Sequence, residues 1–124
     1  MRIFKNAWFN RFARKQKIDD LALIEAIERA ERDLIDADLG GGIIKQRVAR
    51  LGQGKSGGYR TIILYRHKSK AFFVYGFAKN QQENISSEEI VAFKQAAQHI
   101  LSLSDAHLTA MIEKGQFSEV YDYD

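Results

Sequence analysis

The spacing of apolar residues changes twice along this chain of 124 residues, and that change limits the folds it can adopt. Before residue 40, apolar residues recur every three or four positions, as in helices. Between residues 43 and 78, short runs rich in β-branched and aromatic residues are typical of strands. Helical spacing returns after residue 86. This order predicts an α+β protein, with a small antiparallel β-meander packed against N-terminal and C-terminal helices.

Sequence signals at helix ends divide the N-terminal part of the chain. Residues 2–4 could form an edge strand, and aromatic residues at helical spacing over residues 8–13 predict a first short helix. Asp19 or Asp20 is suited to cap a second helix, because a short polar side chain can accept a hydrogen bond from the first turn. The apolar stripe of this helix continues to the glycines at residues 40–42, where we expect it to end.

The central part of the chain is predicted to form the meander, with strands over residues 43–51, 59–66 and 71–78. Glycines fill the first connection and polar residues the second, and both lengths suit antiparallel hairpins. The sequence FFVYGF at residues 72–77 is apolar on both faces. We therefore expect the third strand to be central and covered by helix on at least one side.

Two further helices are predicted after the meander. Ser86 and Glu89 match the capping-box pattern ahead of an apolar stripe. Ser104 or Asp105 is expected to cap a short fourth helix, which stops at Gly115.

Length and composition set the general class of the protein. The absence of cysteine excludes disulfides and thiolate metal sites and is typical of a reducing compartment. Residues 1–17 lack the continuous apolar run of a signal peptide, and no later run could cross a bilayer. We therefore expect a cytoplasmic protein with no membrane partner. A single domain over residues 1–124 is predicted, with residues 116–124 as a candidate acidic tail.

Charged residues are sorted into blocks along the chain, although the net charge is only +3. Residues 1–18 carry six Lys or Arg and no acid, and residues 19–39 carry eight acids against two Arg. Residues 40–82 carry nine cations and no acid, and residues 83–124 carry eight acids against two Lys. The third block needs a polyanion, an acidic partner or neighbouring acidic elements to neutralise it. Its cations are Lys45, Arg47, Arg50, Lys55, Arg60, Arg66, Lys68, Lys70 and Lys79.

Several of these cations can converge on one side of the predicted sheet. Lys45 and Arg47 point the same way because side chains alternate along a strand. Arg60 lies near the start of the second strand and Lys79 follows the third. With Lys55 on the loop above, such a cluster suits the phosphates of RNA. The tyrosines that could stack on splayed bases, with core packing as the alternative for each, are Tyr59, Tyr65 and Tyr75.

Common catalytic devices are missing from the sequence. It contains no cysteine nucleophile, no Gly-x-Ser-x-Gly motif and no phosphate-binding glycine loop ahead of a helix. His67, His99 and His107 are too scattered to suggest a metal site. We therefore expect neither a metal ion nor a small-molecule cofactor.

Three segments stand out as motifs: KQRVAR at residues 45–50, GKSGGYR at residues 54–60 and FVYGFAKN at residues 73–80. Together they resemble the RelE family of toxins from bacterial toxin–antitoxin systems. The similarity covers nearly the whole chain. It implies a RelE-like fold and a ribosome-dependent endoribonuclease that cuts messenger RNA and inhibits translation. The expected partners are a cognate antitoxin protein, the ribosome and messenger RNA.

The resemblance also implies roles for individual residues. In the family, the 2′-hydroxyl attacks the adjacent phosphate and the 5′-oxygen leaves. Arg60 matches an Arg that stabilises the phosphorane charge, and Lys79 matches a basic residue that protonates the leaving oxygen or adds charge stabilisation. Lys45 and Arg47 complete the expected catalytic set. The expected RNA contacts are Arg50, Lys55, Tyr59, Tyr75 and Asn80.

Two other functions stay open. A ParE-like toxin would share the fold but act on DNA gyrase without nuclease activity, although the basic cluster favours RNA. A non-enzymatic module would bind RNA or ribosomes with a steep salt dependence and leave no cut ends. The acidic and aromatic tail at residues 117–124 could instead cover the sheet of the same chain.

Overall fold

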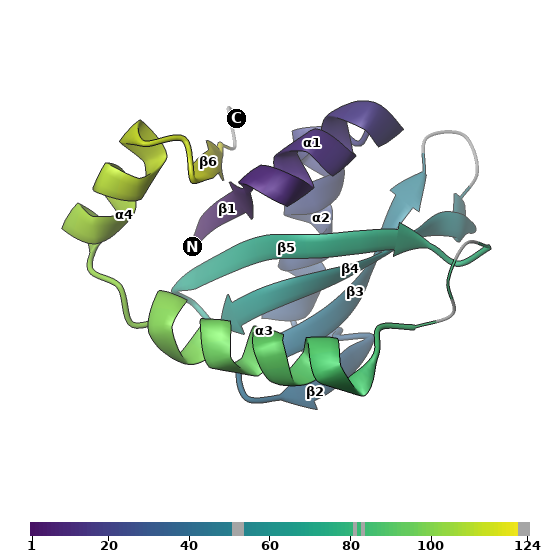
Figure 1. Ribbon diagram of the computed structural model, residues 1–124. Helices are drawn as coiled ribbons and strands as arrows, with labels where there is room; N and C mark the ends of the chain where they lie inside the picture. The colour runs from purple at the N-terminus through teal and green to yellow at the C-terminus, as the bar shows by residue number, and fades with distance from the viewer. Residues whose placement is uncertain (51–53, 81, 83, 122–124) are drawn as a thin grey trace.

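The computed structural model describes residues 1–50, 54–80, 82 and 84–121, and the side chains at positions 50 and 54–56 lie outside this description. The elements in chain order are β1 (Arg2–Asn6), α1 (Ala7–Gln16), α2 (Asp20–Glu31), β2 (Ala37–Gly40), β3 (Ile43–Arg50), β4 (Gly54–Arg66), β5 (Lys70–Ala78), α3 (Ser87–Ile100), α4 (Asp105–Glu113) and β6 (Phe117–Val120). The predicted α+β class is confirmed (Figure 1).

The strands form one six-stranded sheet with the order β2-β3-β4-β5-β1-β6. The predicted meander lies at its centre, since β3, β4 and β5 pair antiparallel in chain order. β1 pairs parallel with β5 and antiparallel with β6. The N-terminal strand therefore lies inside the sheet, and the prediction that it forms an edge is wrong.

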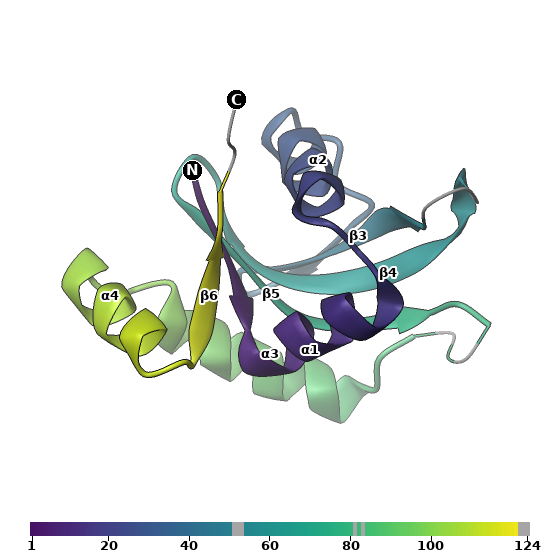
Figure 2. The ribbon, with the colours of Figure 1, turned by 90° about the horizontal axis from the view of Figure 1, so that it is seen from above.

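Helices cover both faces of the sheet, and each face has its own apolar cluster. α1 and α2 pack on one face, here called the α2 face, which carries Ile44, Val48 and Ile63 of the central strands. α3 packs on the other, the α3 face, which carries Ile43 and Ile62, and α4 joins this second cluster. Seen from above, α2 and α3 lie on opposite sides of the curved sheet (Figure 2).

Polar caps begin the helices largely as predicted. Asp19, and not Asp20, caps α2 with its side chain. Ser86 and Glu89 form the predicted capping box of α3, and Ser104 caps α4. No helix within the described residues is long and apolar enough to cross a membrane.

The prediction that the second helix continues to the glycines at residues 40–42 is wrong. α2 ends at Glu31, and the backbone of Asp33 is left-handed with a φ of 62°. A residue in this conformation cannot continue a right-handed helix. Leu34, which extends the apolar stripe in the sequence, is 57% exposed, and the chain after it forms β2 against β3.

β4 begins at Gly54, so the glycine segment predicted as a connection belongs partly to a strand. At Gly58, a Cβ atom would lie 2.2 Å from the carbonyl oxygen of Val48 on β3. Glycine alone permits this close approach, which occurs where the register shifts between Val48 and Arg50. Gly58 therefore shapes the irregular end of the β3–β4 ribbon.

Part of the predicted acidic tail is a strand. Phe117 and Val120 of β6 are buried, and Arg2 of β1 binds Glu119 through hydrogen bonds of 2.9 and 2.8 Å. Both β1 and β5 separate β6 from β4. The described part of the tail therefore does not cover the central strands, and residues 122–124 lie outside the described structure.

Candidate functional site

Three cations lie close together on the α3 face of β3 and β4. Ile44 and Val48 point into the α2 face, so strand alternation places Lys45 and Arg47 on the α3 face. Arg47 lies directly opposite Arg60 in the register of the two strands. The fold thus brings together three of the four residues expected to be catalytic.

The fourth, Lys79, lies in the turn after β5 together with Asn80, and both are exposed. Arg60 pairs with Phe77 across β4 and β5, so this turn begins two residues beyond the partner of Arg60. Lys79 and Asn80 therefore lie at the same end of the sheet as the other cations.

Two residues expected to contact RNA cannot be placed in the same way. The side chains of Arg50 and Lys55 lie outside the described residues. Their backbones belong to the ends of β3 and β4 that join the glycine segment.

The guanidinium of Arg60 has a buried hydrogen-bond donor that finds no partner in the described part of the chain. Its Nη1 atom is the one buried side-chain nitrogen or oxygen without a hydrogen bond among the described residues. Such an atom costs stability, and a like charge directly opposite, on Arg47, adds to the cost. An anion bound by both groups would remove both penalties. The pair is therefore suited to bind phosphate.

Neighbouring carboxylates neutralise this cluster only in part. Arg47 Nη2 lies 3.5 Å from Asp36 Oδ1, and the Arg47 side chain is still 41% exposed. Lys45 Nζ lies 3.4 Å from the amide oxygen of Asn84 instead of a carboxylate. Within the described side chains, neither Lys45 nor Arg60 forms an ion pair. The described carboxylates therefore leave most of the positive charge of the cluster unneutralised, and it can attract an anionic ligand.

The candidate tyrosines of β4 and β5 lie on opposite faces of the sheet. Tyr59 is 2% exposed, and its hydroxyl donates to Gln16 Oε1 of α1 at 2.9 Å. The prediction that Tyr59 contacts RNA is therefore wrong, because strand alternation turns it away from Arg60 and into the core. Tyr75 packs on the α3 face, and its hydroxyl donates to Gln82 Oε1 at 3.1 Å.

Sequence reasoning missed two amides that connect Tyr75 to Lys45. Gln82 accepts from Tyr75, and its Nε2 donates to the carbonyl oxygen of Asn84 at 2.8 Å. The Asn84 side chain in turn accepts from Lys45. A polar loop directly after an apolar central strand was the signal that could have identified them, since functional residues often lie on such loops.

Neither a histidine nor a metal site forms part of the cation cluster within the described residues. No group of three or more potential ligands that could hold a metal ion occurs among the described residues. His67 lies in the β4–β5 hairpin, at the end of β4 far from Arg60, with Nδ1 2.9 Å from Glu31 Oε2. The Tyr65 hydroxyl also donates to Glu31, and burial together with this bond raises the pKa of Tyr65. This cluster holds α2 to the hairpin.

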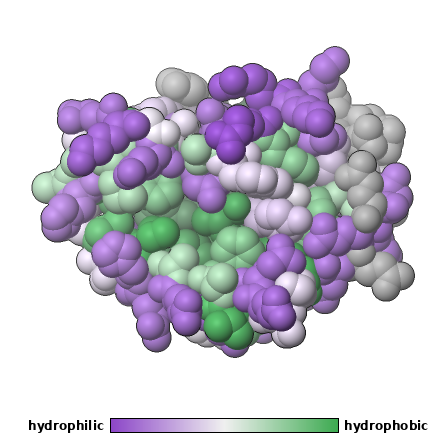
Figure 3. Space-filling view, viewed as in Figure 1, coloured by the Kyte–Doolittle hydropathy of each residue, from purple (hydrophilic) through white to green (hydrophobic). Residues whose placement is uncertain are grey.

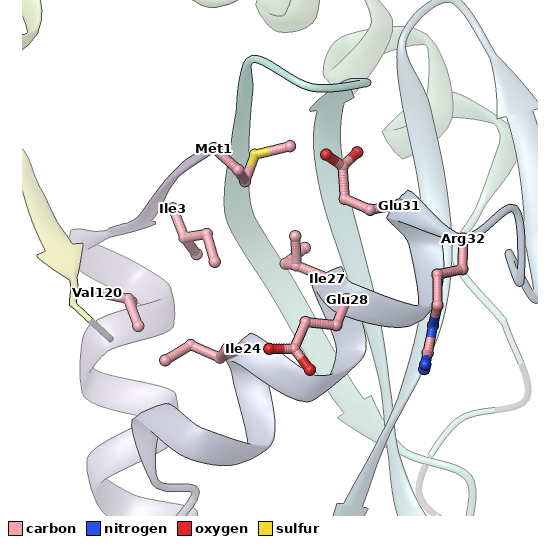
Figure 4. A pocket seen from close by; sticks show the side chains of 8 residues that line it. All are labelled: Met1, Ile3, Ile24, Ile27, Glu28, Glu31, Arg32 and Val120. Atoms are coloured by element: carbon pink, nitrogen blue, oxygen red, sulfur yellow. The ribbon is translucent and has the colours of Figure 1, made fainter. Parts of the chain in front are cut away.

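Two apolar regions of the surface are poor candidates for a phosphate site. On the face shown in Figure 3, hydrophobic side chains gather in the middle, between α3, α4 and the sheet, with hydrophilic ones around them. A separate hollow of about 430 Å³ lies between α2, β1 and β6, and Figure 4 shows its apolar side chains pointing toward one another. They are Met1, Ile3, Ile24, Ile27 and Val120.

Comparison with known proteins identifies the family of the chain. None of the curated proteins compared with the chain matches it. A family model described as the RelE toxin of the RelE / RelB toxin-antitoxin system matches residues 1–120, which is nearly the whole chain. The protein therefore belongs to the RelE toxin family.

Proposed function

We propose that this toxin cuts messenger RNA on the ribosome without a metal ion, and so inhibits translation in the cytoplasm. The observation that carries the proposal is the opposed pair Arg47 and Arg60, because Arg60 Nη1 is buried and has no partner among the described residues. A phosphate of the RNA backbone supplies the anion that this pair lacks. We propose that Lys45 and Lys79 act on the same phosphate.

In the proposed reaction, the 2′-oxygen forms a bond to the adjacent phosphorus and the bond from phosphorus to the 5′-oxygen breaks. The proton of the 2′-hydroxyl passes to Lys45. Arg60 and Arg47 stabilise the charge that develops on the phosphorane oxygens. Lys79 gives a proton to the leaving 5′-oxygen. Such acid–base catalysis contributes only about 10²–10⁴-fold, so the ribosome must supply much of the positioning of the messenger.

Other residues are proposed to hold the RNA. Tyr75 lies two residues before Phe77, the register partner of Arg60, and is proposed to contact a base. Asn80 is exposed in the turn after β5 and is proposed to contact the RNA there. Arg50 and Lys55 keep their proposed role as phosphate contacts. Tyr59 is not part of this set, because it is buried against α1.

Membership of the RelE family implies an antitoxin partner. We propose that an acidic segment of this partner folds onto the basic end of the α3 face, with contacts spread over its cations so that no single one is essential for binding. A disordered chain that orders on binding can wrap such a surface. In that position it would exclude RNA.

The test is primer extension on messenger RNA from cells that express the chain. We expect new 5′ ends within translated messages, and we expect Arg60→Ala to remove them while antitoxin binding, measured by co-purification, is retained. Intact messages together with inhibited gyrase supercoiling would favour the ParE-like alternative. Salt-sensitive ribosome binding without cut ends would favour a non-enzymatic module.

A further inference from the structure

A groove beside the candidate site is lined by residues of α1 and of the C-terminal half of β5. Figure 1 shows where these two elements lie. Within the described register, β1 pairs with β5 only as far as Phe73, so the edge of β5 beyond it faces α1 and not another strand. The groove has a volume of about 450 Å³. The lining residues that bear on its function are Trp8, Arg11, Lys15, Tyr75 and Gln82.

The aromatic side chains that form one wall of this groove are held in place by contacts with one another. The Trp8 ring stacks on Phe12 with 5.2 Å between centroids, and it lies 4.7 Å from the Tyr75 ring. Gly76 makes room for Phe12, since a Cβ there would lie 2.7 Å from the Phe12 ring. Trp8 is nevertheless 38% exposed. A fixed indole that stays partly open to solvent is suited to stack on a planar ligand.

The other wall carries positive charge. Arg11 and Lys15 are one turn apart on α1, and both are exposed. None of the described residues that line the groove is acidic. Cations next to an aromatic ring are the combination that binds single-stranded nucleic acid, because the base stacks while the phosphate pairs with the charge.

The groove is continuous with the cation cluster. Tyr75 lies on β5 two residues before Phe77, the register partner of Arg60. Such diagonal neighbours on paired strands are about 7–8 Å apart, comparable to the step between adjacent nucleotides. The hydrogen bonds through Gln82 and Asn84 also join Tyr75 to Lys45. A strand of RNA held at Arg60 would therefore pass directly into this groove.

We propose that the groove binds a nucleotide flanking the one that is cut, with its base on Trp8 and its phosphate between Arg11 and Lys15. This inference rests on the proposed function, since it takes RNA as the ligand. It adds a binding site on α1 and the edge of β5 that is separate from the proposed catalytic residues.

The test uses Trp8 as its own reporter, because it is the single tryptophan of the chain. The probe is a short 2′-O-methyl oligoadenylate, which has no free 2′-hydroxyl and cannot be cut by the proposed reaction. We expect saturable quenching of Trp8 fluorescence. We expect Trp8→Ala to weaken binding of the labelled probe, measured by anisotropy, about 5-fold or more.

Charge variants on the surface of α1 test the second wall without disturbing the core. Arg11→Ser and Lys15→Ser should each weaken binding and reduce its salt dependence by about 0.7 in the slope of log K against log salt. The matched control is Arg14→Ser, which removes an exposed cation of the same helix that does not line the groove. Arg14→Ser should leave both the affinity and the slope unchanged.

Three results would overturn the proposal. One is an abasic oligonucleotide that quenches Trp8 as strongly as oligoadenylate. The second is a polyglutamate peptide that quenches Trp8 and displaces the RNA, which would make the groove a protein-binding site. The third is a Trp8→Ala variant that cuts messenger RNA at the wild-type rate and binds RNA with unchanged affinity. If the wild-type chain cuts no message but oligoadenylate still quenches Trp8 in a base-dependent way, the proposed function fails and the nucleotide groove stands.

Discussion

Polar groups that are buried on the two faces of β3 and β4 differ in how their hydrogen bonds are satisfied. On the α2 face, the buried Gln46 side chain donates to the carbonyl oxygens of Ala26 and Leu34 and accepts from the Asp36 N–H at 2.6 Å. On the α3 face, Arg60 Nη1 is buried without a partner among the described residues. The α2 face thus fixes α2 on the sheet, while the α3 face keeps an unused donor.

Along this pair of strands, the α2 face contributes to stability and the α3 face is available to bind a ligand. Buried polar groups whose hydrogen bonds are all formed stabilise a fold. An unpaired donor beside a like charge lowers stability, and a bound anion can remove that loss. The same alternation that buries Val48 against α2 presents Arg47 on the other side. Substitutions on the two faces should therefore have opposite consequences.

The largest effect is expected for Arg60→Met, which removes the unpaired donor and keeps similar side-chain volume. We expect the rate of messenger cutting to fall about 100-fold or more, while the free energy of unfolding stays equal or rises by up to about 1 kcal/mol. Single-turnover cutting and urea unfolding measure the two quantities. Arg66→Met, at an exposed position of the same strand, is the control. A loss of stability in Arg60→Met would show that Arg60 supports the fold, and would remove the contrast between the faces.

The opposite result is expected for Gln46→Ala. It removes three hydrogen bonds in the core and leaves the Asp36 N–H without its partner. The free energy of unfolding should fall by about 2–3 kcal/mol, with an unchanged cutting rate per folded molecule. Urea midpoints provide the measurement, with exposed Gln95→Ala on α3 as the control. A change below about 0.5 kcal/mol would contradict the stabilising role of this network.

A smaller effect is expected for Gly76→Ala, which tests how tightly α1 closes the α2 face. The added Cβ would lie 2.7 Å from Phe12 Cε2, so the ring must move. We expect a loss of about 1–2 kcal/mol in thermal unfolding, partly restored when Phe12→Leu is added. Strictly additive losses in the double variant would show that the two side chains do not compete for space.

The smallest effect is expected at the far end of the sheet, where Glu31 joins α2 to the β4–β5 hairpin. Burial alone would raise the pKa of Glu31, but hydrogen bonds from Tyr65 and the Lys68 N–H, with the nearby His67, lower it below its ordinary value of 4.5. A lowered folded-state pKa contributes stability above 4.5, and this contribution is lost as the pH falls through the folded-state value.

We therefore expect Glu31→Gln to reduce stability at neutral pH by about 1 kcal/mol or less, and to flatten the decline of stability in acid. Urea midpoints across the acid range measure this difference. Glu28→Gln, exposed one turn earlier on α2, should keep the wild-type pH profile. An acid decline of equal steepness in Glu31→Gln and the wild-type chain would rule out this contribution.

Local sequence signals predicted much of the fold because they act over a few residues. The Ser86–Glu89 box and the Asp19 cap are formed by neighbours along the chain, and the three central strands follow from their own apolar runs. β6 has only four residues, and it pairs with β1 at the other end of the chain, so no local pattern predicts it. Leu34 misled the prediction of α2, because its apolar character carries no information about the left-handed turn at Asp33.

The sequence by itself determined the α+β order and the charge blocks, including the basic stretch that contains Lys45, Arg47 and Arg60. Only the tertiary structure decided that Arg47 faces Arg60, that Tyr59 enters the core, and that Trp8 lies against Tyr75. The physical reason is that strand register and helix packing are set by burial on the opposite face and by contacts between residues distant in sequence. No local pattern specifies those contacts.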